Sequence, residues 1–167
     1  LLKIYNVPVL YFPKFFHPDP TVKRQSGFLK PSVNNSNILG SSLNLPYYHV
    51  ISHNKDFTFR PTFFDSDIKM FQNEYRLKNK YSSTILDFSF VDGYQSSLSS
   101  KTNSITHFFA EFDTNLAWKN FTQSDLFISF KKVSNDTYLK IFDSNIFKNK
   151  ATPKDYDVLN SEAQLIL

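Results

Sequence analysis

The stretch LNLPYYHVISHNKDFTFRPTFF, residues 43–64, decides the fold class of this 167-residue chain. On both sides of His53-Asn54, apolar and polar residues alternate with a period of two, which is typical of β-strands with one buried face. Each of the two expected strands nevertheless has a proline in its middle, Pro46 and Pro61. Proline lacks the N–H that a sheet ladder uses, so we expect a β-hairpin in which each strand is weakened at one position.

The same alternation recurs along most of the chain after residue 42. The composition agrees with it, because the 19 Phe and 9 Tyr, against 3 Gly, favour strands. We therefore expect an all-β protein of about seven antiparallel strands behind an N-terminal β element at 4–12, which Pro8 interrupts. The expected strands fall in 43–52, 57–63, 69–78, 86–90, 106–118, 126–130 and 158–167. Residues 134–150 are less regular, and a short helical turn fits there.

Along the expected strands, aromatic residues recur on one face and polar or charged residues on the other. The strongest case is 106–118, where Phe109 is the exception to the alternation. Two such faces suit the wall of a membrane β-barrel, and they also suit a soluble β-sandwich with one face in water. Periodicity alone does not separate these two folds. No apolar run approaches the about 20 residues of a membrane-spanning helix.

Several classes of function find no support in the sequence. The 19 basic and 15 acidic residues are mixed along the chain, so the formal net charge of +4 forms no dense nucleic-acid-binding patch. His49 and His53 are four residues apart, about 13 Å along a strand, which is too far for two ligands of one metal ion. There is no cysteine, and no motif of a serine hydrolase, zinc protease or phosphate-binding loop occurs. We therefore predict no catalytic residue, no metal site and no cofactor.

Short motifs occur in a fixed order over residues 7–76. The N-terminal ones are Val7-Pro8, Tyr11, Pro13, the basic pair Lys23-Arg24 and the run Ser26-Gly27-Phe28-Leu29-Lys30-Pro31. The later ones are Pro46-Tyr47-Tyr48, the strand DFTFRP at 56–61, and Glu74-Tyr75-Arg76. Together these motifs resemble the family of the lipopolysaccharide-assembly protein LptD, also called organic solvent tolerance protein. A weaker likeness follows in 133–143.

The resemblance implies a division of the chain. Residues 1–12 would form the end of a periplasmic β-jellyroll, and residues 42–167 the first seven or so strands of an outer-membrane β-barrel. Residues 13–41 would form a proline-rich connector, whose motif consists of Lys23, Arg24, Ser26, Gly27, Phe28 and Pro31. The chain starts at Leu1 rather than Met and within strand-like sequence, so we expect it to be part of a longer protein and its barrel to be incomplete.

The resemblance also implies a function, the delivery of lipopolysaccharide to the outer leaflet of the Gram-negative outer membrane. The partners would be lipopolysaccharide, the lipoprotein plug LptE, the periplasmic bridge protein LptA and membrane lipid. Pro46 and Pro61, in the first and second barrel strands, would form a lateral gate. The residues that would face the polar lumen are Arg60, Glu74, Arg76, Glu111 and Asp113, and those that would face lipid are Phe57, Phe59, Phe63, Phe108, Phe112 and Leu116.

Two alternatives stay open at this point. One is a generic outer-membrane porin or uptake barrel, against which the two prolines and the connector motif argue. The other is a soluble β-sandwich that binds glycans through its aromatic residues, which would stay soluble without detergent.

Overall fold

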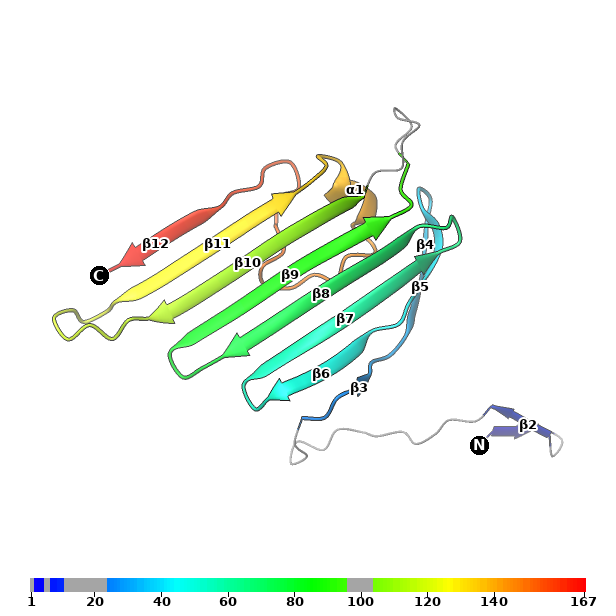
Figure 1. Ribbon diagram of the computed structural model, residues 1–167, viewed down its shortest axis with the longest axis horizontal. Coiled ribbons are helices and arrows are strands. Elements are labelled where there is room, and N and C mark those ends of the chain that lie inside the picture. Colours follow the sequence, from blue (N-terminus) through cyan, green and yellow to red (C-terminus); the bar gives the residue numbers. More distant parts are fainter. Residues whose placement is uncertain (1, 5–6, 11–23, 96–103) are drawn as a thin grey trace.

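The computed structural model describes residues 2–4, 7–10, 24–95 and 104–167, and its regular structure is almost entirely antiparallel β-strand (Figure 1). Strands β1 (Leu2–Ile4) and β2 (Val7–Leu10) pair with each other. The main sheet is formed by β3 (Gly27–Phe28), β4 (Ser32–Ser36), β5 (Gly40–Asn44), β6 (Tyr47–Ser52), β7 (Lys55–Phe64), β8 (Lys69–Lys78), β9 (Ser82–Asp92), β10 (Ile105–Asn115), β11 (Asp125–Val133) and β12 (Glu162–Ile166). The expectation of an all-β antiparallel fold is confirmed.

From β7 to β12, each strand pairs with its successor in the chain, so this part of the sheet is an up-and-down meander that ends in an open edge. The alternating pattern of 106–118 is shorter as a strand, because β10 ends at Asn115. Ala117 adopts φ 50°, and the N–H of Leu116 donates to the carbonyl of Ser124 at 2.7 Å, which starts the loop to β11. Leu116 therefore lies outside the strand in which we expected it.

The start of the sheet differs from the expectation. β5 and β6 lie end to end along β7 and are separated at Leu45-Pro46. Outside them, β4 pairs with β5 and β3 pairs with β6, so part of the expected connector forms an additional arm at 27–36. Pro46 therefore lies in the second arm of the sheet and Pro61 in the third, rather than in the first and second strands. We did not predict the outer arm from the sequence, because the residues around Asn34 are polar and show no alternation of apolar and polar side chains.

A glycine makes this additional arm possible. The chain turns back at 37–39 and enters β5 through Gly40, whose φ of 75° lies in the left-handed region. A Cβ at this position would lie 2.2 Å from Oδ1 of Asp65, so a larger residue would both strain the backbone and clash. The hairpin of β4 and β5, called the first hairpin below, therefore depends on this glycine.

The connections at the two ends of the strands differ in length. At one end, called the short-turn end, lie 53–54, 79–81 and 116–124. At the other, called the long-loop end, lie 37–39, 65–68, the described ends of the 12-residue connection between β9 and β10, 93–95 and 104, and the 28-residue connection 134–161 (Figure 1). Residues 134–161, which join β11 to β12, are called the β11–β12 segment.

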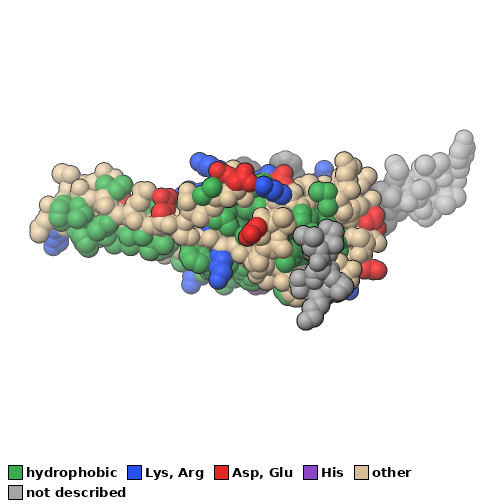
Figure 2. Space-filling view, turned by 90° about the horizontal axis from the view of Figure 1, so that it is seen from above, with side chains coloured by type: hydrophobic (Ala, Val, Ile, Leu, Met, Phe, Trp, Pro, Cys, Tyr) green, Lys and Arg blue, Asp and Glu red, His purple; other side chains and the backbone are tan. Residues whose placement is uncertain are grey.

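The strands β7 to β11 present two chemically different faces, because side chains alternate across a strand. The covered face buries polar side chains and is crossed by the β11–β12 segment. The open face carries exposed side chains, namely Phe63, Phe88, Phe90, Phe108, Ile128 and Phe130, and it also carries Phe57, Phe59 and Phe112. In Figure 2, hydrophobic side chains gather along one side of the sheet. The expected alternation of aromatic and polar residues is thus present.

An apolar core lies on the covered face near the long-loop end, beneath the helix α1 (Tyr138–Phe142) of the β11–β12 segment. Its buried members include Phe64, Met70, Val91, Ile105 and Phe109 from the sheet and Tyr138, Leu139 and Phe142 from the helix. Phe109 broke the alternation in the sequence because it packs into this core. The helix confirms the expected helical turn in 134–150. At five residues it is too short to cross a membrane, and the described residues contain no helix that could.

Candidate functional site

Polar side chains from four adjacent strands meet on the covered face. The buried ones are Asp56, Thr58, Arg60 and Thr62 of β7, Gln72 and Glu74 of β8, Asp87 and Ser89 of β9, and His107 and Glu111 of β10. A buried polar group without a partner costs about 1–3 kcal/mol, so this face needs partners for its donors and acceptors. Most of them come from neighbouring strands and from the β11–β12 segment, while Nη1 of Arg60 has no hydrogen-bond partner among the described residues.

Opposite charges alternate along β7 and β8. Nε of Arg76 lies 2.7 Å from Oδ1 of Asp56 and 3.5 Å from Oε1 of Glu74. Arg60 is 3.8 Å from the same Glu74 oxygen, and its guanidinium carbon lies 3.7 Å from the centre of the Phe147 ring. We expected from the sequence that Arg60, Glu74 and Arg76 share one face, and in the structure they do. Their charges partly neutralise one another.

Asp87, His107, Ser89 and Tyr138 form a closed cluster in the middle of the covered face. Nε2 of His107 lies 3.0 Å from Oδ1 of Asp87, while its Nδ1 lies 2.7 Å from the Tyr138 hydroxyl and 3.0 Å from Oγ of Ser89. Burial raises the pKa of the Tyr138 hydroxyl, which therefore remains protonated. These residue types resemble a hydrolase triad, but the side chains of His107 and Asp87 have 0% exposure, which leaves no room for a substrate. The cluster instead holds α1 against the sheet.

The β11–β12 segment supplies further partners for the buried groups. Gln72 exchanges two hydrogen bonds with the backbone of Phe147: its Nε2 donates to the carbonyl at 3.0 Å, and its Oε1 accepts from the N–H at 2.8 Å. Nδ2 of Asn149 donates to Oε2 of Glu74 and to Oδ2 of Asp87, each at 2.8 Å. Asn149 was not among the residues that we expected to be functional. The charged residues on a face expected to line a lumen were nevertheless a signal that such partners exist.

Glu111 and Asp113 of β10 meet a single cation. Nζ of Lys150 lies 2.5 Å from Oε1 of Glu111 and 3.5 Å from Oδ2 of Asp113. The contact with Glu111 raises the pKa of Lys150. Asp113 also accepts a 2.5 Å hydrogen bond from Oγ of Ser83. The β11–β12 segment thereby joins the two acidic residues that we had grouped on one face.

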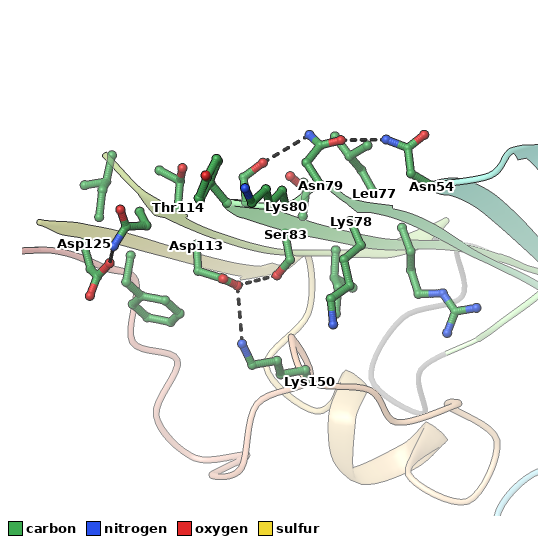
Figure 3. A pocket seen from close by; sticks show the side chains of 18 of the residues that line it. Asn54, Leu77, Lys78, Asn79, Lys80, Ser83, Asp113, Thr114, Asp125 and Lys150 are labelled. Atoms are coloured by element: carbon green, nitrogen blue, oxygen red, sulfur yellow. Dashed lines mark hydrogen bonds and ion pairs between the residues drawn. The ribbon is translucent and has the colours of Figure 1, made fainter. Parts of the chain in front are cut away.

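Toward the short-turn end, the covered face is hollowed into a groove of about 1120 Å³ (Figure 3). Charged residues of both signs line it: the cations Arg24, Arg76, Lys78, Lys80 and Lys150, and the acids Asp56, Asp113 and Asp125. Figure 3 shows Asp113 between Ser83 and Lys150, and Lys78 on β8, the strand next to that of Ser83. Within the described ranges, no three His, Cys, Asp or Glu side chains gather as metal ligands. The groove presents a surface that carries charges of both signs.

Each of the two prolines occupies a residue pair in which only one ladder hydrogen bond is made. The N–H of Leu45 donates to the carbonyl of Pro61 at 3.0 Å, and the N–H of Leu29 donates to the carbonyl of Pro46 at 2.8 Å. A hydrogen-bonded pair in an antiparallel ladder normally exchanges two such bonds, and proline lacks the donor for the second. The second arm, β5 and β6, is therefore incompletely bonded on both of its sides.

The connector motif packs against the same arm. Arg24 forms an ion pair with Asp56, and Oγ of Ser26 accepts a 2.8 Å hydrogen bond from the N–H of Val50. Gly27 and Phe28 form β3, and the Phe28 ring packs edge-on against Tyr47, with ring centres 5.1 Å apart. Pro31 precedes β4. Lys23 lies outside the described residues, as do Tyr11 and Pro13 of the motif.

The tip of the β11–β12 segment contacts the first hairpin. Asn34 of β4 and Ser42 of β5 are directly opposite each other in the ladder. Nδ2 of Asn34 donates to the carbonyl of Ser144 at 3.0 Å, and Nδ2 of Asn145 donates to Oγ of Ser42 at 2.8 Å. The segment therefore reaches across the covered face from β10 to β4.

The sequence was also compared with those of known proteins. The family model described as LptD protein matches residues 1–152. LPS-assembly protein LptD of Legionella pneumophila (strain Lens) is 30% identical over 162 residues, which cover 87% of this chain and 18% of the relative. The protein of the same name from Idiomarina loihiensis is 26% identical over 172 residues, which cover 98% of this chain and 21% of the relative.

A third relative of that name, from Polaromonas sp., is 46% identical over 61 residues, which cover 36% of this chain and 7% of the relative. The chain thus spans about a fifth or less of the length of these curated relatives. The match to the family model includes more than half of the chain. The chain therefore belongs to the LptD family.

Proposed function

We propose that the protein containing this chain assembles lipopolysaccharide at the bacterial outer membrane, and that the main sheet is part of the wall of its barrel. The names of the relatives support this role at the level of the family. The observation that carries the proposal is the contrast between the two faces of the sheet. The open face exposes phenylalanine rings that lipid would cover, and the covered face buries charges that suit a polar lumen.

The lengths of the connections support an orientation for this wall. Outer-membrane barrels have short turns on the periplasmic side and longer loops outside the cell. The short-turn end would then face the periplasm, and the β11–β12 segment would fold into the lumen from the outside. Arg24, which leads from the connector into the first arm, lines the groove at the short-turn end. A chain arriving from a periplasmic jellyroll at residues 1–12 would enter the wall at this end.

Pro46 and Pro61 belong to the lateral gate in this proposal. At each proline one ladder hydrogen bond is missing, and such a bond is worth ~0.5–1.5 kcal/mol. The pairing of the second arm with its neighbours is therefore weaker than the pairing among β8, β9 and β10. The additional arm at 27–36 lies outside Pro46, so this arm would meet the last strand of the complete barrel. Opening along the weakened ladders would let the lipid part of lipopolysaccharide enter the bilayer sideways while its sugars remain in the lumen.

The groove at the short-turn end gives the lumen a charged entrance. Lipopolysaccharide carries phosphate groups, and Arg76, Lys78 and Lys80 line the groove from one strand and its turn. The lumen-facing set of this proposal is Arg60, Glu74, Arg76, Glu111 and Asp113. LptA would deliver lipopolysaccharide to this side, and LptE would fill the part of the lumen that the complete barrel leaves open.

Depletion of the full-length protein in a host that depends on it tests the proposed function. We expect lipopolysaccharide at the cell surface to fall, and a plasmid copy of the protein to restore it. Surface lipopolysaccharide that stays unchanged on depletion would contradict the proposal. If depletion reduced only the uptake of small solutes, the chain would belong to a general uptake barrel instead.

A further inference from the structure

We propose that the tip of the β11–β12 segment, Ser144-Asn145, is a latch that holds the first hairpin against the sheet and must release when the barrel wall opens. The proposal rests on the gate described above. It adds to that gate a second fastening, made by side chains of a loop rather than by the ladder bonds next to the prolines.

The body of the β11–β12 segment is firmly attached to β8, β9 and β10. Gln72 binds the backbone of Phe147 twice, and Asn149 bridges Glu74 and Asp87. Further along the same face, Lys150 pairs with Glu111, and Tyr138 joins the buried cluster around His107. The segment and these three strands therefore form one unit.

The tip of the segment makes a smaller and more accessible contact. Asn145 donates to Oγ of Ser42, which itself donates to the carbonyl of Asn34 at 3.4 Å. The side chain of Asn34 then donates to the carbonyl of Ser144. Two adjacent loop residues thus bind a directly opposed pair of residues in the first hairpin. All of these bonds are between neutral groups. Ser144 is exposed and Ser42 is buried, so water can reach the bond between Asn34 and Ser144 first when the contact opens.

Apart from the latch, the first hairpin is joined to the rest of the sheet through β7 and its end, where Asn44 donates to Oγ1 of Thr62 and Ser66 donates to the carbonyl of Leu39. Its ladder to β7 consists of the pairs of Ser42 with Phe64, Leu43 with Phe63 and Asn44 with Thr62, and Ser41 exchanges hydrogen bonds with Asp65 at the end of β7. Leu39 reaches the apolar core. Any outward movement of the hairpin relative to β8, β9 and β10 stretches the bonds of Asn34 and Asn145. Opening of the wall at its first arms therefore requires release of the latch.

A disulfide across the latch tests this inference in the full-length protein. The side chains of Ser42 and Asn145 are in contact, and this chain has no cysteine, so Ser42→Cys with Asn145→Cys introduces the new pair. We expect the cross-linked protein to reach the outer membrane at normal abundance and lipopolysaccharide delivery to fall at least tenfold. Each single-cysteine variant should deliver normally.

A matched control places the disulfide at the base of the same segment. Thr106 and Ser134 face each other where the segment leaves β11, and the N–H of Ser134 donates to the carbonyl of Thr106 at 2.9 Å. Thr106→Cys with Ser134→Cys joins parts that stay together during opening, so delivery should not change. Normal delivery by the cross-linked latch protein would overturn the proposal, as would an equal loss in the control. Neither result bears on lipopolysaccharide assembly itself, which the depletion experiment tests separately.

Breaking the latch should have the opposite effect. In the Asn34→Ala, Asn145→Ala double variant, the wall should open more often, and the host should become at least fourfold more sensitive to large antibiotics at normal protein abundance. Asn37→Ala is the control, because this residue is exposed in the turn of the same hairpin and lies outside the contact with Ser144 and Asn145. Unchanged sensitivity of the double variant would also overturn the latch.

Discussion

The side-chain amide of Asn149 donates a 2.8 Å hydrogen bond to Oδ2 of Asp87, a residue 62 positions earlier in the chain. Asp87 has no exposed surface, and its carboxylate also accepts from Gln72 and faces Nε2 of His107. A residue of the β11–β12 segment therefore completes the hydrogen bonding of a carboxylate inside the sheet. The segment and the sheet stabilise each other through such contacts.

The first prediction concerns this contact. Asn149→Ala removes a donor from both Glu74 and Asp87 while both carboxylates stay buried, so we expect a loss of about 1–3 kcal/mol in the free energy of unfolding. The temperature at which the full-length protein unfolds on a heat-modifiability gel measures this loss. Asn160→Ala, at an exposed position of the same segment, should unfold at the wild-type temperature. Equal midpoints for the two variants would refute the prediction.

The second prediction compares the two faces at neighbouring positions of β10. Phe112 lies on the open face, and Asp113 lies in the groove of the covered face. An arginine on a lipid-facing position near mid-bilayer costs ~2–4 kcal/mol, whereas a lumen position can keep the charge hydrated. Phe112→Arg should therefore reduce the amount of assembled full-length protein far more than Asp113→Arg. Equal loss of the heat-modifiable form in both variants would sink this assignment of the faces.

The third prediction concerns the prolines. Alanine at position 46 or 61 supplies the missing N–H opposite the carbonyl of Leu29 or Leu45, so each pair can exchange both of its bonds. The arms should separate less often, while alanine leaves the strand unstrained. We expect normal abundance in the outer membrane, reduced lipopolysaccharide delivery and greater sensitivity to large antibiotics, with the double variant most affected.

Both readouts must come from one strain for this prediction. Normal lipopolysaccharide export in the Pro46→Ala, Pro61→Ala double variant would exclude the gate role. Loss of the protein from the outer membrane would instead assign the prolines a structural role in shaping the start of the sheet.

The fourth prediction concerns pH. Nζ of Lys148 and the Tyr156 hydroxyl each lie 2.7 Å from Oδ1 of Asp143, and they lower the pKa of Asp143 from its ordinary value of 3.8. A carboxyl group with a lower pKa in the folded state contributes stability above its unfolded pKa, and this stability disappears as pH falls through the lowered pKa. The β11–β12 segment should therefore loosen as pH falls below 3.8.

Hydrogen exchange in residues 143–156 of the full-length protein, compared with Asp143→Asn at matched pH, measures this effect. The variant should exchange faster than the wild type at neutral pH, and the difference should shrink in acid. The effect should be small, because Lys148 and Asp143 are both about half exposed to solvent. A difference that stays constant down to the lowest pH would contradict the role of Asp143.

Some of the candidate site was predictable from the sequence, because the side chains of a strand alternate whatever the strand packs against. Arg60, Glu74 and Arg76 could be assigned to one face from the period of two alone. Their partners Phe147 and Asn149 could not, because these residues lie 75 or more positions away, in an irregular stretch after a helical turn. No local pattern shows that such a stretch folds back across the strands.

Local patterns in the sequence were enough to predict that the chain is built of β-strands, that the strands have an aromatic and a polar face, and that the chain resembles the LptD family. Periodicity and short ordered motifs are local properties, and they survive in any fold that keeps the strands paired. Three features became visible only in the folded chain: residues 27–36 form an additional arm outside Pro46, Phe109 packs beneath α1, and Asn34 and Ser42 bind Ser144 and Asn145. Each of these features depends on which distant segments of the chain meet. Buried polar groups of the sheet need hydrogen-bond partners, and its buried hydrophobic side chains need packing partners. Only the fold shows which residues come close enough to serve.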